Sequence, residues 1–246
     1  MSLLELNGIT KSFGAIHALN GVNLSIDPGE AVGLMGDNGA GKSTLMKIVA
    51  GNFLPTSGEI RIEGKPVELS KPIDAREAGI EIVYQDLALC DNLTAGANVY
   101  LGRELKKRIG PISMLDYASM YKRAGELFAE LKSETRPRDL VQQMSGGQRQ
   151  AVAIARTRLS DPKLVLMDEP TAAISVRQVA EVLALIKRLK DTGHAVILVS
   201  HRMPDVFEVC DRVAVLRRGA KVADKRIDET SPEEVTGLII GAIEAA

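Results

Sequence analysis

The sequence predicts an α/β fold with a parallel-sheet core, an N-terminal antiparallel β subdomain and an inserted, mainly helical subdomain. A strand-length apolar run at residues 31–35 leads into a glycine-rich segment, and residues 42–50 are compatible with a helix. The last third of the chain alternates strand-like and helix-like segments, which is the pattern of a parallel sheet covered by helices. Between these regions, apolar residues recur at helical spacing over residues 116–132.

The N-terminal third is expected to contain short antiparallel strands. Val22, Leu24 and Ile26 alternate with polar or small residues, and residues 27–30 form a turn before the buried strand. Residues 59–63 have the composition of a strand and residues 64–66 that of a turn, which together indicate a β-hairpin. An antiparallel sheet is therefore expected beside the core.

The middle of the chain has the pattern of a helical lobe. Its main helix is expected between Asp116 and Lys132, and a second helical pattern continues until residues 160–162 interrupt it. We interpret the apolar stripe of the main helix as lobe core rather than as a ligand site; it comprises Tyr117, Met120, Tyr121, Ala124, Leu127, Phe128 and Leu131.

The last third is expected to complete the sheet. Its predicted strands are residues 163–167, 195–199, 212–216 and 221–223, and its predicted helices are 179–189, 204–210 and 233–246. We therefore expect a single domain over residues 1–246, with a core and β subdomain at 1–85 and 161–246 and a helical subdomain at about 86–160.

Composition argues against several classes of partner. The 246 residues include 31 Lys and Arg against 32 Asp and Glu, so the net charge is -1. Neither a broad nucleic-acid-binding face nor a polybasic membrane anchor is expected from this balance. No apolar run approaches the ~20 residues that span a bilayer, and no secretion signal is expected. Cys90 and Cys210 lack metal-ligand spacing, which favours reduced thiols in the cytoplasm.

The glycine-rich segment Gly36–Ser43 fits the phosphate-binding pattern G-x-x-x-x-G-K-[ST]. Its glycines allow successive backbone N–H groups to face phosphate oxygens, and Lys42 supplies positive charge for the β and γ groups. The strand before it and the helix after it make a chance glycine turn the weaker interpretation. The candidate nucleotide-binding residues are Gly36, Asp37, Asn38, Gly39, Ala40, Gly41, Lys42, Ser43 and Thr44.

Two carboxylates end the apolar strand at 163–167. Ligand sites of open α/β sheets lie at such strand ends, and Asp168 and Glu169 follow directly. Asp168 is expected to support Mg²⁺ through water, while the Ser43 hydroxyl contacts the metal. Glu169 is then the candidate general base for the water that attacks the γ-phosphorus. A solvated acidic pair is the alternative, which the upstream glycine segment makes the weaker one.

A second glycine segment, Ser145–Gly146–Gly147–Gln148, begins a helix. Ser145 is a suitable N-cap, and the helix dipole favours an anion ahead of it. One chain therefore carries two separate segments suited to anions. A single nucleotide contacts both only if they converge, either within a chain or across two chains.

With these motifs, the chain resembles the ATP-binding subunit of ABC transporters over nearly its whole length. Gly36–Ser43 resembles the Walker A motif, Met144–Gln148 the signature motif and Leu164–Glu169 the Walker B motif. The resemblance implies a head-to-tail dimer that binds two ATP molecules with Mg²⁺. Each ATP would lie between Walker A of one subunit and the signature Ser145, Gly146, Gly147 and Gln148 of the other.

The resemblance also assigns roles to three further residues. Phe13 matches the aromatic that stacks on adenine, although it could instead be a core residue. Gln85 matches the glutamine that contacts Mg²⁺, which completes an implied metal set of Ser43, Gln85 and Asp168. His201 matches the histidine that contacts the γ-phosphate. The implied catalytic residues are Glu169, His201 and Lys42.

One position departs from the family pattern. Ser175 occupies the place of an aspartate in the loop after the catalytic glutamate. A charged contact across the dimer is thus replaced by a hydroxyl, which implies altered communication between the two ATP sites. Met144 in place of leucine is a mild apolar exchange.

A narrower resemblance is to importers of simple sugars of the ribose, xylose and fructose type. It rests on residues 38–46, 82–85 and 100–104. It implies an ATPase that energises monosaccharide import from the cytoplasmic face of the membrane, as a peripheral protein. The implied partners are a second copy, transmembrane permease subunits and, indirectly, a solute-binding protein, with no nucleic acid.

Functions other than sugar import account for fewer of these motif residues. An ABC ATPase for a non-sugar solute remains an alternative, whereas one acting on DNA or the ribosome should carry a coiled-coil, zinc-binding or basic insertion. A regulator that does not hydrolyse ATP would have no need of Lys42, Asp168, Glu169 and His201 together. A kinase would leave Ser145–Gln148 unexplained.

Overall fold

The computed structural model describes residues 2–172 and 174–243, which form two compact units. Unit 1 comprises Met1–Ile82, Pro162–Pro170 and Leu189–Ala246, and unit 2 comprises Val83–Asp161 and Thr171–Arg188. Beside the expected helical segment at about 86–160, unit 2 therefore also contains the residues that follow Pro170. No helix in the described part of the chain is both long and apolar enough to cross a membrane.

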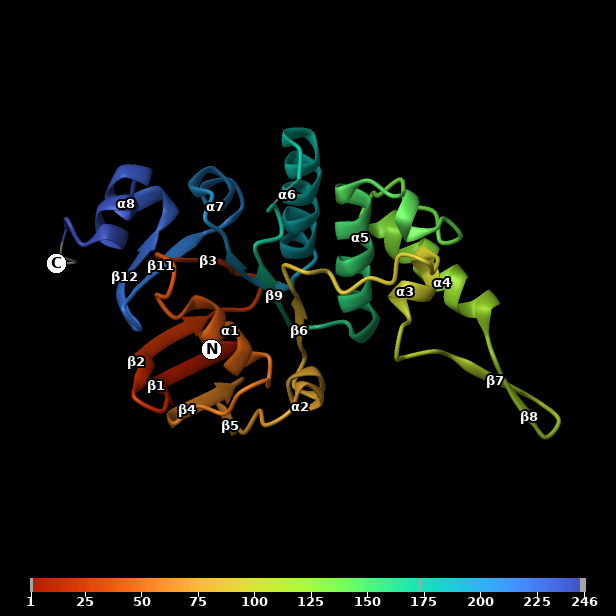
Figure 1. Ribbon diagram of the computed structural model, residues 1–246, viewed down its shortest axis with the longest axis horizontal. Coiled ribbons are helices and arrows are strands. Elements are labelled where there is room, and N and C mark those ends of the chain that lie inside the picture. Colours follow the sequence, from red (N-terminus) through yellow and green to blue (C-terminus); the bar gives the residue numbers. More distant parts are fainter. Residues whose placement is uncertain (1, 173, 244–246) are drawn as a thin grey trace. The chain divides into compact units, whose positions relative to one another are not determined.

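The antiparallel sheet of unit 1 has the order β2-β1-β4-β5 (Figure 1). Its strands are β1 (Leu4–Phe13), β2 (Ile16–Ile26), β4 (Ser57–Ile62) and β5 (Lys65–Val67). The expectation of short strands was wrong for β1 and β2, which have 10 and 11 residues. Irregular register along β1, with Gly8 at a φ of 61°, interrupts the strict alternation that marks a long strand.

The second sheet of unit 1 has the order β12-β11-β3-β10-β9-β6. It is built from β3 (Ala31–Met35), β6 (Ile80–Val83), β9 (Leu164–Asp168), β10 (Ala195–Val199), β11 (Arg212–Arg217) and β12 (Ala220–Arg226). Strand β10 pairs in parallel with β3 and β9, β3 pairs in parallel with β11, and β12 is antiparallel. Every residue of β3 and β10 is buried. The predicted α/β architecture is confirmed.

The helices of unit 1 are α1 (Lys42–Val49), α2 (Pro72–Glu77), α7 (Met203–Val209) and α8 (Pro232–Ile240), with a 3-10 turn at Ile227–Glu229. The predicted C-terminal helix over 233–246 was too long, because Gly241 adopts a left-handed conformation with a φ of 78° and ends α8. The last three residues of that prediction lie outside the described residues.

The core of unit 1 joins α1 to both sheets. Leu24 and Ile60 from the antiparallel sheet, Leu45 from α1, and Leu34 and Leu166 from the parallel sheet belong to one buried apolar cluster. Burial of this apolar surface is the main term that stabilises the unit. The loop between β3 and α1 is consequently held at both ends by core residues.

Unit 2 contains α3 (Ala95–Val99), α4 (Tyr117–Glu130), α5 (Gly146–Thr157), two 3-10 turns (Val141–Gln143 and Arg158–Ser160), and α6 (Val176–Asp191) up to Arg188. The stripe on α4 forms lobe core as predicted at its buried positions Met120, Ala124, Leu127 and Phe128. Tyr117 does not follow this prediction, because it lies at the start of the helix with 51% of its surface exposed.

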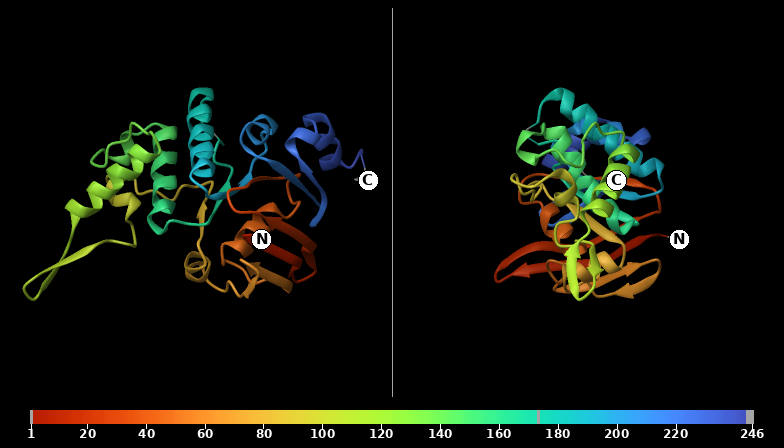
Figure 2. Two further views of the ribbon diagram at one scale, coloured as in Figure 1. Left: turned by 180° about the vertical axis from the view of Figure 1, so that it is seen from behind. Right: turned by 90° about the vertical axis from the view of Figure 1, so that its right-hand side faces the viewer.

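A β-hairpin precedes α4 in unit 2, where the sequence indicated mainly helix. Its strands are β7 (Lys106–Ile109) and β8 (Ile112–Leu115), and Gly110 in the turn has a φ of 61°. Figures 1 and 2 show it extending away from α3, α4 and α5. Both strands are short and every residue of β8 is at the surface, so no buried alternation marks them in the sequence.

Candidate functional site

The glycine loop between β3 and α1 has a backbone that only glycine fits at two positions. Gly36 has a φ of 152°, and a Cβ there would lie 2.2 Å from the carbonyl oxygen of Leu216. Gly41 has a φ of 104°, and a Cβ there would lie 2.7 Å from the carbonyl oxygen of Ala18. The two glycines therefore let the loop pack closely against the backbone of Leu216 and Ala18.

The turn between β11 and β12 braces this loop. The Gly219 N–H donates to the Ala40 carbonyl at 3.0 Å, and the Asn20 N–H donates to the Gly219 carbonyl at 2.8 Å. The Asn20 side chain also donates to the Arg218 carbonyl at 3.0 Å. The sequence predicted only the strands on either side of this turn, at 212–216 and 221–223, because contacts between distant segments leave no local signal.

Lys42 is a buried cation at the start of α1. Only 6% of the residue is exposed, and its Nζ donates to the carbonyls of Gly36 at 2.8 Å and Asp37 at 3.0 Å. Burial lowers the pKa of Lys42, while Glu169, Asp37 and Asp168 oppose this shift. A desolvated ammonium is costly without a counter-charge, so the loop fits a polyphosphate well. Ser43 follows it with an exposed position at the helix N-terminus, and Thr44 is half-buried.

Asp168 and Glu169 stand at the end of β9, as predicted. The Glu169 N–H donates to the Val199 carbonyl at the end of β10, at 2.9 Å. Burial raises the pKa of Asp168, opposed by Lys42, Lys47 and His201. Burial also raises the pKa of Glu169, opposed mainly by His201. Glu169 has a φ of 50°, an uncommon conformation for a residue with a side chain and one that often occurs at functional sites.

Unit 1 brings Glu169 and His201 together. The Nε2 atom of His201 lies 3.1 Å from Glu169 Oε1, and the His201 N–H donates to Glu169 Oε2 at 3.4 Å. The Oε1 atom is buried and accepts no hydrogen bond from the described residues. A buried carboxylate oxygen that accepts no hydrogen bond is suited to accept a proton from a substrate water.

The acidic side chains do not form a closed metal cage. Among residues 2–172 and 174–243, no group of three or more His, Cys, Asp and Glu side chains could hold a metal ion. The oxygens of Ser43 and Asp168 suit Mg²⁺, which commonly binds few protein ligands and retains water and phosphate oxygens. The donor set therefore fits an ion that arrives with a nucleotide.

Phe13 ends β1 at the surface rather than in the core. Its exposed fraction is 43%, and its ring packs edge-on against Phe53 with 5.5 Å between centroids. The Lys11 Nζ lies 5.1 Å from the centroid of the Phe13 ring. A fixed and partly exposed aromatic ring of this kind can stack on a further ring.

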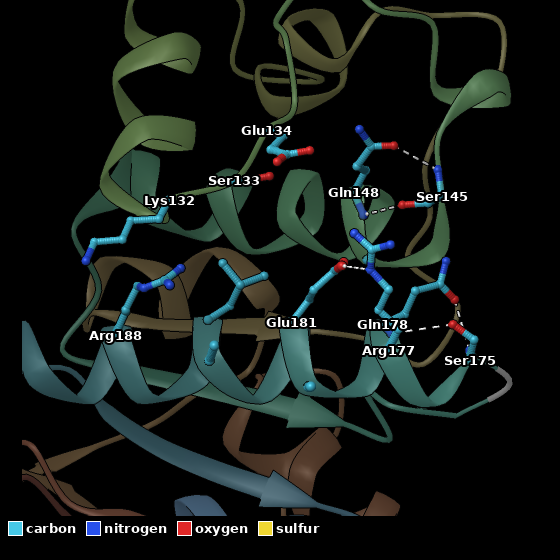
Figure 3. A pocket seen from close by; sticks show the side chains of 14 residues that line it. Lys132, Ser133, Glu134, Ser145, Gln148, Ser175, Arg177, Gln178, Glu181 and Arg188 are labelled. Atoms are coloured by element: carbon cyan, nitrogen blue, oxygen red, sulfur yellow. Dashed lines mark hydrogen bonds and ion pairs between the residues drawn. The ribbon is translucent and has the colours of Figure 1, made fainter.

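In unit 2, Ser145 caps α5 as the sequence predicted. The Ser145 N–H donates to Gln148 Oε1 at 3.0 Å, and the Gln148 N–H donates to Ser145 Oγ at 3.3 Å, which forms a capping box. Figure 3 shows both bonds. Gln85 also belongs to unit 2 and is exposed after β6.

The signature glycines pack closely against Ile174 and α6, and the constraint is firmer at Gly146, because the neighbour of Gly147 is the end of a flexible side chain. A Cβ at Gly146 would lie 2.8 Å from Ile174 Cγ2, and a Cβ at Gly147 would lie 2.5 Å from Glu181 Oε2. A cavity of about 790 Å³ opens beside these residues, between the start of α5 and α6 (Figure 3). The glycines thus allow the start of α5 to approach α6 closely.

Ser175 forms a second capping box that sequence reasoning missed. The Ser175 N–H donates to Gln178 Oε1 at 2.9 Å, and the Gln178 N–H donates to Ser175 Oγ at 3.4 Å (Figure 3). The S-x-x-Q spacing was the available signal. The hydroxyl that replaces the family's aspartate therefore has a local structural role at the start of α6.

Comparison with known proteins agrees with this geometry. The family model described as ABC transporter matches residues 19–172. A ribose import ATP-binding protein of Burkholderia pseudomallei is 42% identical over 240 residues, covering 97% of this chain and 46% of that protein. A xylose/arabinose import ATP-binding protein of Sulfolobus acidocaldarius is 44% identical over 238 residues, covering 96% of this chain and 93% of that protein. The chain spans about half the length of the ribose-import relatives it matches.

Solved structures of similar fold include a dimeric ATP-binding cassette bound to ADP and phosphate in a post-hydrolysis state. It is 30% identical to this chain, with a TM-score of 0.75, and the match covers 91% of this chain and 98% of that one.

Proposed function

The chain belongs to the ABC transporter family, and we propose that it is a single ATPase domain that binds and hydrolyses ATP with Mg²⁺. The observation that carries the proposal is the contact between Glu169 and His201 beside the buried cation Lys42, all within unit 1. Glu169 would act as general base, and Lys42 and His201 would contact the transferred phosphate. Ser43, Gln85 and Asp168 would hold Mg²⁺, and Phe13 would stack on adenine.

Two copies would complete each site. The glycine loop belongs to unit 1 and Ser145–Gln148 to unit 2, and the dimeric cassette of similar fold supports a head-to-tail pair. Hydrolysis should then rise more than linearly with protein concentration in a dilute range. Strict proportionality down to nanomolar protein would instead assign catalysis to the monomer.

The hydrolysis would energise import of a simple sugar through separate permease subunits, with the chain bound peripherally at the cytoplasmic face. Support comes from relatives whose names specify ribose import and xylose/arabinose import. A non-sugar solute is the alternative, since the solute contacts other proteins rather than this chain.

The decisive experiment is reconstitution. The chain should co-purify with its permease, and hydrolysis in proteoliposomes should increase when a solute-binding protein loaded with ribose, xylose or fructose is added. Stimulation by a non-sugar solute alone would assign the chain to another importer. Full ATPase activity with no permease association would exclude the transport role while retaining the enzymatic one.

A further inference from the structure

The hairpin β7–β8 combines cationic and apolar side chains on the surface of unit 2. Lys106, Lys107 and Arg108 are exposed in β7. In β8, Ile112 is 61% exposed, Met114 51% and Leu115 37%. Apolar groups of this size usually contribute to a core, so their exposure together marks a contact surface.

The strand register places basic side chains of β7 opposite mainly apolar side chains of β8. Lys106 pairs with Leu115, Lys107 with Met114 and Arg108 with Ser113. One strand of the ribbon is therefore basic and the other mainly apolar, on both faces. The sequence from residue 105 to 115 contains three cations and no acidic residue.

The nearest acidic residues in the sequence are engaged at the base of the hairpin. Glu104 accepts a hydrogen bond from the Gly102 N–H at 2.9 Å, and Asp116 caps α4 by accepting from the Ser119 hydroxyl at 2.8 Å. Lys107 approaches Asp116 only to 3.9 Å, with half of its side chain exposed. Arg108 has no hydrogen bond or ion pair within the described part of the chain. The positive charge of the hairpin is thus largely free to attract an external anion.

The hairpin is attached to the lobe chiefly at its base. The Asp116 N–H donates to the Leu105 carbonyl at 2.8 Å, and the sheet has only two strands. An isolated two-stranded ribbon is marginal in water and gains stability from a surface on which it packs. Basic residues beside exposed apolar side chains are the combination that favours the interface of an anionic bilayer.

We propose that β7–β8 docks on anionic phospholipid at the membrane surface. Ile112 and Met114 enter the headgroup region together with Lys107, which shares their face of the ribbon, while Lys106 and Arg108 on the opposite face add to the attraction towards the anionic surface. The inference goes beyond the proposed function, and it rests on the hairpin's own chemistry rather than on ATP hydrolysis. Each cation near such a surface strengthens binding about fivefold, so replacing all three should weaken it on the order of 100-fold.

The test is co-sedimentation of the full chain with vesicles of pure phosphatidylcholine and with vesicles containing phosphatidylglycerol. We expect binding to the anionic vesicles that weakens with salt. The triple variant Lys106→Gln, Lys107→Gln and Arg108→Gln should lose it. A matched control replaces Lys65, Lys122 and Lys187 by Gln, which changes the net charge equally at exposed positions outside the hairpin.

An apolar variant pair tests the other strand. Ile112→Ser with Met114→Ser should weaken binding to anionic vesicles, whereas Ile73→Ser with Ile240→Ser, at exposed positions elsewhere, should not. Absence of vesicle binding, or equal binding by hairpin and control variants, would overturn the proposal. So would hairpin variants that bind vesicles normally but fail to assemble with a permease in detergent, since the partner would then be a protein. ATP hydrolysis measured on the same variants separates this outcome from failure of the ATPase function.

Discussion

The imidazole of His201 lies 3.1 Å from the carboxylate of Glu169, at the ends of neighbouring parallel strands. The Glu169 side chain is 13% exposed and that of His201 is 52% exposed. The pair therefore presents a shielded proton acceptor beside an accessible polar group. This difference in exposure suits Glu169 as the base that takes a proton from a water, and His201 as the residue that contacts the neighbouring phosphate.

Glu169→Gln should retain ATP binding and lose about a hundredfold or more in kcat, because the amide cannot accept the proton of the attacking water. Steady-state phosphate release and nucleotide-binding titration would measure the two effects separately. Glu63→Gln is a control, since Glu63 is a surface acid paired with Lys163. Near-normal hydrolysis by Glu169→Gln would remove Glu169 from the role of base.

Asp168→Asn should stabilise the nucleotide-free protein at neutral pH. The folded-state pKa of Asp168 is raised by burial, so the free energy of unfolding falls as the pH rises from the unfolded pKa of about 3.9 to the higher folded-state pKa and stays lower at neutral pH. The gain should shrink as the pH falls below the raised folded-state pKa and should vanish towards about 3, where the side chain is protonated in both states. Thermal unfolding from pH 3 to 8 would measure this gain, and each 1 kcal/mol corresponds to about 2–4 °C in Tm. The exposed Asp191→Asn is the control; a gain independent of pH would contradict the explanation.

Gly36→Ala and Gly39→Ala should separate steric conflict from backbone strain. A Cβ at Gly36 meets the Leu216 carbonyl, whereas none of the described atoms lies within 4 Å of one at Gly39, although its φ is 78°. We expect a loss of about 3–5 kcal/mol for Gly36→Ala and about 1–2 kcal/mol for Gly39→Ala. Urea unfolding of both variants is the measurement. Equal losses would show that the Leu216 carbonyl in β11 does not constrain the loop.

Ser175→Ala should lower the free energy of unfolding by about 1 kcal/mol through loss of the α6 cap, while Ser175→Asp should retain it. Chemical denaturation would measure both, with the exposed Ser113→Ala as control. If Ser175→Asp proved as destabilising as Ser175→Ala, the hydroxyl would have to act through something other than capping.

The sequence predicted the elements that are anchored by buried apolar strands. The glycine loop follows β3 and Asp168 ends β9, so motif and strand could be recognised together. Elements with little burial were harder to predict. The hairpin β7–β8 was missed because it is exposed, and the lengths of β1 and β2 were underestimated because register shifts hide their periodicity.

Site features that depend on contacts between distant segments also could not be predicted from local sequence patterns. The brace from Gly219 to Ala40 joins residues far apart in the chain, and the close approach of Gly146 to Ile174 depends on how α5 packs. By contrast, the capping box of Ser175 and Gln178 was visible in the sequence as S-x-x-Q. Comparison of Ser175 with the family's aspartate alone does not reveal this capping role.

The contact between Gly146 and Ile174 links the sizes of two side chains that are 28 positions apart (174 − 146). A methyl group at position 146 fits only if the side chain at position 174 becomes smaller. Substitutions at the two positions are therefore coupled. Among descendants of this sequence, a larger side chain at position 146 should therefore occur together with a smaller one at position 174. The substitutions at the two positions should then be correlated.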